Sequence, residues 1–205
     1  MRGLIGKKIG MTRVFNSRGQ AIPVTVLEAG PCQVTQVKSI DNDGYDSVQV
    51  GYSVAKDKHL NKPTKGHFTK HGVSPMRILA EFKKVPDFEY KPGQVFNVGL
   101  FKEGDLVTVS GKSKGRGFSG TVKKYSFSQQ RKTHGQGDTH RHVGSIGAAS
   151  DPSRVFPGKK MPGRFGNKKV SVNSLEIIKI NENSNQLLVK GSIPGAPNGI
   201  VIITR

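Results

Sequence analysis

Residues 105–120 read DLVTVSGKSKGRGFSG, and the change of character within this stretch decides the fold. The first six residues are rich in Val and Thr, which is typical of a β-strand. The last ten residues contain four glycines and three cations and show almost no apolar periodicity. The sequence therefore predicts a strand that ends near residue 111, where a segment of a different kind begins.

That segment, residues 112–169, carries fourteen Lys or Arg against two acids, a net charge of +12 out of +19 for the whole chain. It also contains ten glycines. A segment with this much charge cannot bury enough apolar surface to offset the conformational entropy that it loses on ordering. We expect it to be disordered alone and to order on a polyanion, where each phosphate contact releases counterions. RNA is the favoured polyanion, since glycine-rich basic arms can pass between its helices.

Both flanks of this segment have ordinary charge and the periodicity of strands. We predict strands at 21–27, 33–40, 45–52, 105–110, 170–180, 186–190 and 199–204. Asp41–Gly44 predicts a hairpin turn, because glycine accepts a positive φ.

Helix is predicted only as two turns over 75–82, and the polar residues 56–71 read as a loop. The predicted fold class is mainly β: one barrel or sandwich that both flanks, 1–111 and 170–205, close together. An insertion with little regular structure spans about 55–92, and 112–169 is a long basic irregular extension.

Bulk properties narrow the class of protein further. A pI near 10.2 points to nucleic acid or an anionic membrane. No apolar run approaches the ~20 residues that span a bilayer, so we expect no membrane partner. The charged N-terminal residues do not resemble a signal peptide. The single Cys32 excludes an internal disulfide framework and fits a reducing compartment. We expect a cytoplasmic protein.

Residues 115–120 match the dinucleotide-binding pattern G-x-G-x-x-G. That function would need a helix opening at the third glycine inside a βαβ unit, with an acid on the next strand. The residues after Gly120 show little helical spacing, and Asp138 lies in a polar loop. Residues 111–113 also resemble the end of a P-loop, but Leu106 stands where the first glycine is required. We therefore disfavour a nucleotide site and expect no small-molecule substrate.

His134, His140 and His142 lie close together in the sequence and could be read as a zinc site or as general acid/base residues. The pattern has no paired Cys and no H-E-x-x-H motif, so we favour RNA contacts and expect no metal, no cofactor and no catalysis. The predicted RNA-binding residues are Lys112, Lys114, Arg116, Gly117, Lys123, Lys124, Arg131, Lys132, His134, His140, Arg141, His142, Arg154, Lys159, Lys160, Arg164, Lys168 and Lys169.

Short motifs follow one another along nearly the whole chain. They are GLIGKKIGMT (3–12), IPVTV (22–26), AGPC (29–32), DGY (43–45), GHF (66–68), SKGRGFSG (113–120), GSIG (144–147), GKKMPGR (158–164) and LVKG (188–191). In these motifs the chain resembles the family of large-subunit ribosomal protein three, in its bacterial form. Residues 101–124 form the signature region. Thr108 and Lys124 depart from the usual Asp or Asn and the usual Arg, but they keep polar or cationic character.

The resemblance implies a translation-protein-type β-barrel and a loop that reaches toward the peptidyl-transferase centre. It also implies direct binding to 23S ribosomal RNA, nucleation of subunit assembly, and large-subunit proteins fourteen and nineteen as neighbours. Ala148 replaces the Gln that is methylated in some members, so we expect no modification there. Two functions remain as alternatives: a nucleotide-dependent enzyme that uses residues 115–120, and a free-standing nucleic-acid chaperone.

Overall fold

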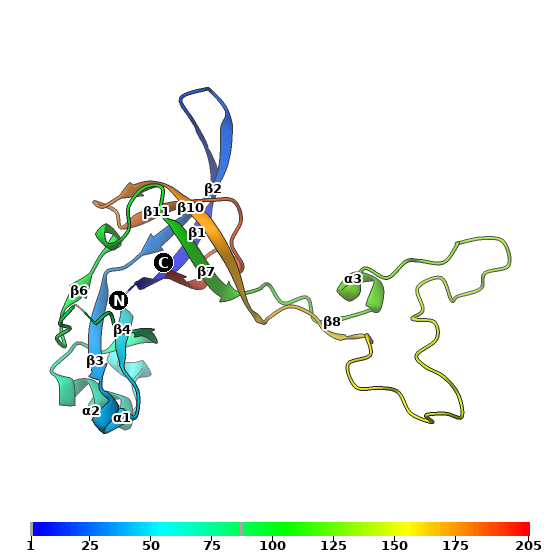
Figure 1. The fold of residues 1–205 in the computed structure, drawn as a ribbon, viewed down its shortest axis with the longest axis horizontal. Helices are drawn as coiled ribbons and strands as arrows, with labels where there is room; N and C mark the ends of the chain where they lie inside the picture. Colours follow the sequence, from blue (N-terminus) through cyan, green and yellow to red (C-terminus); the bar gives the residue numbers. More distant parts are fainter. Residues whose placement is uncertain (1, 87) are drawn as a thin grey trace. The chain divides into compact units, whose positions relative to one another are not determined.

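The computed structural model describes residues 2–86 and 88–205 (Figure 1). It divides into two units, which are described separately. The barrel unit comprises the described residues up to Ser113 together with Lys169–Arg205, and the extension is Lys114–Lys168. No helix in the described part of the chain is long and apolar enough to cross a membrane. That 1–111 and 170–205 act as one globular domain, with 112–169 as an RNA-binding extension that orders only on RNA, stays a prediction.

Six strands of the barrel unit close into an antiparallel barrel, so the mainly-β prediction is confirmed (Figure 1). Around the barrel these strands are β1 (Gly3–Phe15), β12 (Ile200–Thr204), β7 (Leu106–Lys112), β10 (Lys169–Asn181), β11 (Gln186–Lys190) and β2 (Ala21–Ala29). Alternate side chains point inward. Val107, Val109, Val201 and Ile203 are buried, while Leu106 is exposed. This alternation is why runs of Val and Ile in these strands form one core.

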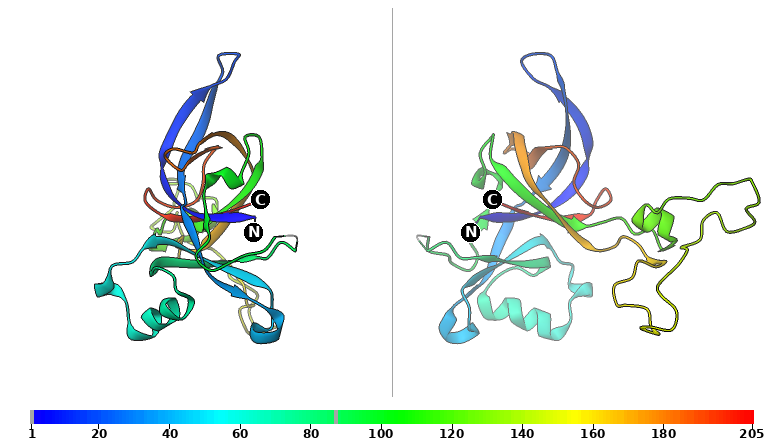
Figure 2. Two further views of the ribbon diagram at one scale, coloured as in Figure 1. Left: turned by 90° about the vertical axis from the view of Figure 1, so that its left-hand side faces the viewer. Right: turned by 45° about the vertical axis from the view of Figure 1, so that its right-hand side comes forward.

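Strand β1 is not among the strands predicted from the sequence, because its cations and glycines hide the strand pattern. Lys8 is 8% exposed, and its ammonium donates to the Ile193 carbonyl at 2.9 Å and to the Gly195 carbonyl at 3.3 Å. A buried cation is tolerated when its donors are satisfied in this way. The outer part of β1 pairs with β2 as a hairpin that extends beyond the barrel (Figure 2).

The predicted strands 33–40 and 45–52 do not belong to the barrel, which corrects that assignment. They form a second sheet in the order β5 (Met76–Lys83), β4 (Ser47–Val54), β3 (Cys32–Lys38), β6 (Val95–Phe96) (Figure 2). Buried Val34, Val48 and Val50 join one apolar cluster with barrel residues such as Leu4 and Val109. One core therefore supports both sheets. The hairpin at 41–44 is confirmed, with the short helix α1 (Ile40–Asp43) as its turn and Gly44 at φ +81°.

Two assignments in the insertion are wrong. Residues 75–82 are not helical, since β5 pairs with β4 in continuous register and its exposure alternates along the strand. The predicted loop 56–71 contains the short helix η1 (Asp57–His59) and the helix α2 (Lys62–His71). Phe68 anchors α2 with 1% of its surface exposed, and Gly72 ends it in the left-handed conformation. A single buried aromatic side chain was too weak a periodic signal to predict this helix.

A further short helix, η2 (Val98–Leu100), leads from β6 toward β7. The extension has little regular structure: β8 (Phe118–Ser119), α3 (Thr121–Tyr125) and β9 (Gly163–Arg164). Within 114–168, all of which is described, the buried residues are Ser119 and Thr121, and no apolar side chain is buried. The extension thus has no hydrophobic core.

Candidate RNA interface

Two predicted cations lie directly opposite each other at the end of the barrel. Lys112 closes β7 and Lys169 opens β10, and the antiparallel register pairs these two residues. Both are exposed. Like charges facing each other across strands are destabilising unless an anion lies between them. Two positions further into the barrel, the Ser110 and Ser171 hydroxyls lie 2.7 Å apart and join the two strands.

Inside the extension, a two-stranded ribbon holds the outgoing and returning chain together. The Arg116 amide donates to the Phe165 carbonyl and the Phe165 amide donates to the Gly117 carbonyl, both at 2.9 Å. Beyond these bonds, Phe118 pairs with Arg164. The Arg116 guanidinium lies 5.1 Å from the centre of the Phe165 ring. Such a cation–π contact orients a guanidinium while leaving its N–H donors free for phosphate.

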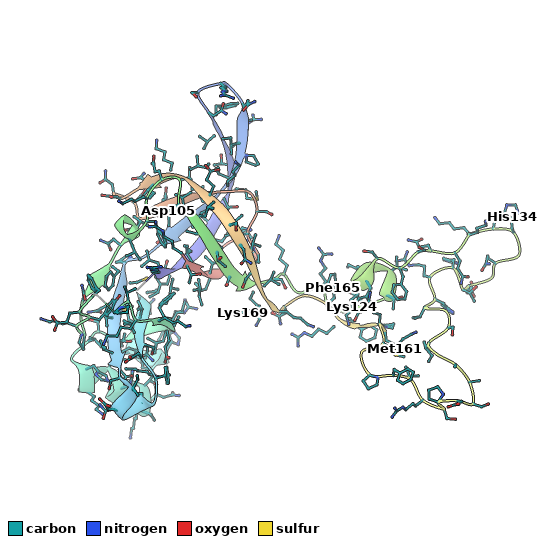
Figure 3. All side chains as sticks on the ribbon, viewed as in Figure 1. Asp105, Lys124, His134, Met161, Phe165 and Lys169 are labelled. Atoms are coloured by element: carbon teal, nitrogen blue, oxygen red, sulfur yellow. The ribbon has the colours of Figure 1, made fainter. Side chains whose placement is uncertain are left out.

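A second aromatic ring gathers two cations that are far apart in sequence. The Lys124 ammonium lies 5.0 Å and the Lys160 ammonium 5.8 Å from the centre of the Tyr125 ring. A Cβ at Gly163 would lie 3.2 Å from the Lys124 ammonium, so the small residue leaves room for that side chain. Two ammonium groups over one ring present a concentrated positive charge. Figure 3 labels Lys124 and Phe165 in this part of the extension.

The aromatic rings that contact these cations are not among the site residues predicted from the sequence. Besides Tyr125 and Phe165, Phe156 lies with its ring centre 5.6 Å from the Arg154 guanidinium, and Phe118 is 81% exposed. Aromatic residues interleaved with cations are a known signal of single-stranded RNA binding, because rings stack on bases. That interleaving could have added these positions to the predicted site.

The predicted histidines lie in the irregular distal loop, and Figure 3 shows His134 at its end. His134 has a φ of +62°, and the His140 carbonyl accepts a hydrogen bond from the Gln130 amide at 3.1 Å. Among the described residues, the structure brings no three His, Cys, Asp or Glu side chains into a cluster that could hold a metal ion. The other predicted residues in the extension away from the rings are also exposed: Lys114, Lys123, Arg131, Lys132, Arg141, His142, Lys159 and Lys168.

Charge compensation differs between the two units. In the barrel unit, the Lys38 ammonium lies 2.7 Å from a Glu81 carboxylate oxygen, and this hydrogen bond raises the pKa of Lys38 and lowers that of Glu81. In the extension, Arg131, Lys132 and Arg141 have no acidic partner within 4.0 Å among the described residues. With twelve Lys or Arg against two acids, the extension has a net charge of +10. Its field attracts a polyanion.

The glycine pattern at 115–120 does not have the surroundings of a dinucleotide site. Helix α3 does follow Gly120, but it is five residues long. The preceding β7 pairs antiparallel with β10 and β12, and β8 pairs antiparallel with β9. The parallel βαβ unit that such a site requires is not formed by these elements. Gly117 has a φ of +65°, a left-handed conformation that glycine adopts without strain, and its contact with RNA stays a prediction.

Comparison with known proteins gives one consistent result. The family model described as Ribosomal protein L3 matches residues 86–190. The curated Large ribosomal subunit protein uL3 of Thermotoga petrophila is 48% identical over 203 residues, covering 99% of this chain and 96% of that protein. The protein of the same name from Prochlorococcus marinus is 48% identical over 201 residues, covering 98% and 92%. This chain belongs to the ribosomal protein L3 family.

Proposed function

We propose that this protein binds 23S ribosomal RNA directly through its extension and through the paired Lys112 and Lys169. As a member of the ribosomal protein L3 family, it is a structural constituent of the large ribosomal subunit and resides in the ribosome of the cytoplasm. The barrel unit is the folded anchor, and the extension neutralises phosphates between RNA helices.

The observation that carries the proposal is a net charge of +10 on a segment that buries no apolar side chain. Hydrophobic burial cannot order such a segment, and its own charges repel one another. RNA phosphates remove the repulsion, and the rings of Phe118 and Phe156 offer exposed faces for bases. By family resemblance, we further propose that the extension reaches toward the peptidyl-transferase centre, that the protein nucleates assembly, and that proteins fourteen and nineteen are its neighbours.

The register of β7 and β10 allows a clean test. Because Lys112 and Lys169 are directly paired, residues 113–168 can be replaced by Asn-Gly, a two-residue turn that suits an antiparallel hairpin. Binding to 23S ribosomal RNA is measured by filter retention over a series of KCl concentrations. If six to ten cations contact phosphates, the log–log salt slope of the full chain should be roughly −4 to −9.

The shortened variant should keep its circular-dichroism melting transition but lose most of the affinity and most of the salt slope. Full affinity without the extension would refute the proposal. A matched comparison separates the chaperone alternative: the full chain should sediment with the large subunit through a high-salt wash, whereas a chaperone would dissociate. Retention on a nucleotide-dye column with release by free nucleotide would instead favour the enzyme alternative.

A further inference from the structure

A cavity of about 410 Å³ lies in the barrel unit, beside β6 and η2 and at the adjoining ends of β1 and β12. A cavity of this size is in the range that takes a small organic group. Its lining residues are Arg2, Val85, Phe88, Tyr90, Phe96, Leu100, Phe101 and Arg205.

Three aromatic rings form one wall of the cavity. The ring centres of Phe88 and Tyr90 are 4.8 Å apart, those of Phe88 and Phe96 are 6.0 Å apart, and those of Tyr90 and Phe96 are 6.2 Å apart. Phe88 is 43% exposed, whereas Tyr90 is 6% exposed. The inner rings therefore hold Phe88 in place while it presents aromatic surface to solvent, which suits stacking of another planar group.

The Tyr90 side chain contributes a buried polar group to this wall. Its hydroxyl is buried and has no hydrogen-bond partner among the described residues. A buried hydroxyl without a partner is costly, and most such groups in native proteins are satisfied. Because the oxygen is covered in the structure, a ligand with a donor or acceptor would remove this cost only if the Tyr90 side chain shifted to expose the hydroxyl to the cavity, whereas a purely apolar ligand would leave it.

Two arginines complete the site. The Arg205 amide donates to the Arg2 carbonyl at 2.8 Å, so the two residues are held side by side at neighbouring strand ends. A guanidinium nitrogen of Arg205 lies 3.1 Å from Asp105, whose carboxylate also accepts from the Lys102 amide at 2.9 Å. Asp105 thus positions Arg205. The Asp105 carboxylate offsets the charge of Arg205, but Arg2 has no acidic partner among the described residues, so the positive charge of Arg2 is available to an anion.

We propose that this cavity binds one unpaired nucleotide of ribosomal RNA. The base stacks on Phe88, the Tyr90 side chain shifts so that its hydroxyl meets the polar edge of the base, and Arg2 with Arg205 holds the adjoining phosphate. A planar apolar surface, a single hydroxyl and adjacent guanidinium groups are the features that recognise an unstacked base with its phosphate. The inference rests on the proposed function, because it assigns a second RNA contact to a protein that binds RNA through its extension.

The test uses the full chain bound to 23S ribosomal RNA. Irradiation at short ultraviolet wavelength followed by mass spectrometry of peptide–nucleotide adducts should give an adduct on Phe88 or Tyr90. Phe88→Ala should lose this adduct and weaken binding roughly fivefold or more, as expected for one lost stacking partner. The matched control is Phe15→Ala, since Phe15 is also exposed with an arginine (Arg13) 6.0 Å from its ring, but lies outside the cavity.

Tyr90→Phe separates binding from folding. Removing a hydroxyl that has no partner within residues 2–86 and 88–205 should leave the melting temperature unchanged or raise it. It should nevertheless weaken RNA binding, by roughly two- to tenfold for one neutral hydrogen bond. If Tyr90→Phe instead lowered the melting temperature and left RNA binding unchanged, the hydroxyl would be bonded within the protein. That result would overturn the inference.

The outcomes also distinguish this inference from the proposed function. If the full chain binds the RNA with a steep salt slope but Phe88→Ala and Tyr90→Phe behave like Phe15→Ala, the cavity takes no nucleotide and the proposed function stands. An adduct between the cavity and a neighbouring protein in the assembled subunit would likewise overturn the inference. If the full chain does not bind 23S ribosomal RNA, both fail.

Discussion

Gly166 and Gly117 form a matched pair that isolates the effect of close backbone approach in the extension. Both have left-handed backbones, with φ of +72° and +65°. An added Cβ at Gly117 would meet no atom of the described residues within 4 Å. At Gly166 it would collide with the Lys114 carbonyl and lie 3.2 Å from the Gly115 Cα. The same substitution, Gly→Ala, therefore has the same conformational cost at both positions but a steric cost at one.

The expected losses of RNA affinity follow from these two costs, the conformational one and the steric one. A left-handed alanine costs about 1–2 kcal/mol, so Gly117→Ala should weaken binding to 23S ribosomal RNA roughly tenfold. Gly166→Ala adds the displacement of backbone, about 1–3 kcal/mol, which corresponds to roughly a further five- to 150-fold. The strain acts on binding because we expect the extension, which has no core, to be ordered only on RNA.

The measurement is filter binding at one fixed salt concentration, with melting of the barrel unit as the control for folding. Both variants should melt like the unsubstituted protein, because neither glycine belongs to the barrel unit. Equal losses of affinity for the two variants would refute the reasoning, since the contact with Lys114 would then have no role in the bound conformation. A loss of barrel stability in either variant would also contradict it.

Trypsin should cut the free protein within 112–169 and leave the barrel unit whole, and bound 23S ribosomal RNA should suppress these cuts; a segment that resists trypsin without RNA would contradict the expected disorder. Gly117→Val should weaken RNA binding more than Lys169→Ala, because valine is disfavoured at positive φ whereas Lys169 is one cation among many. Lys169→Ala should lower the salt slope by about one unit. If Lys169→Ala lost more RNA affinity than Gly117→Val, charge would matter more to binding than the backbone conformation. Burial raises the pKa of the Cys32 thiol from its ordinary 9.0 to about 11, so the thiol ionises first in the unfolded chain. The free energy of unfolding should therefore fall as pH rises from 9 to 11, by about 1.4 kcal/mol per pH unit, and urea titrations of Cys32→Ala should lack this component.

Most barrel strands could be predicted from the sequence because their β-branched residues alternate between the core and solvent. The strand predicted over 186–190 matches β11, and that over 199–204 matches β12 within one residue. The exceptions have physical causes. Lys8 interrupts the apolar pattern of β1, and its ammonium is satisfied by carbonyls 185 and 187 residues away in the chain. Residues 76–83 have a composition that also suits a helix, and pairing with β4 decides that they form a strand.

The cations of the candidate site could be predicted because charge and composition need no tertiary contact to be recognised. What the side chains contact could not be predicted. Lys124 and Lys160 converge on Tyr125, and Arg116 meets Phe165, only because the ribbon of β8 and β9 brings distant residues together. The cavity beside β6 gave no sequence signal, since its residues come from both ends and the middle of the chain.

The sequence by itself determined the mainly-β class, the family and the position of a core-less basic segment, because local composition sets whether a segment can bury apolar surface. The tertiary structure alone decided that 33–40 and 45–52 leave the barrel for a second sheet, and that Lys112 and Lys169 face each other. It alone decided that the Tyr90 hydroxyl is buried without a hydrogen-bond partner in the part of the chain that the structure describes. These features depend on which distant strands pair and in which register, and periodicity within one segment carries no information about its partner.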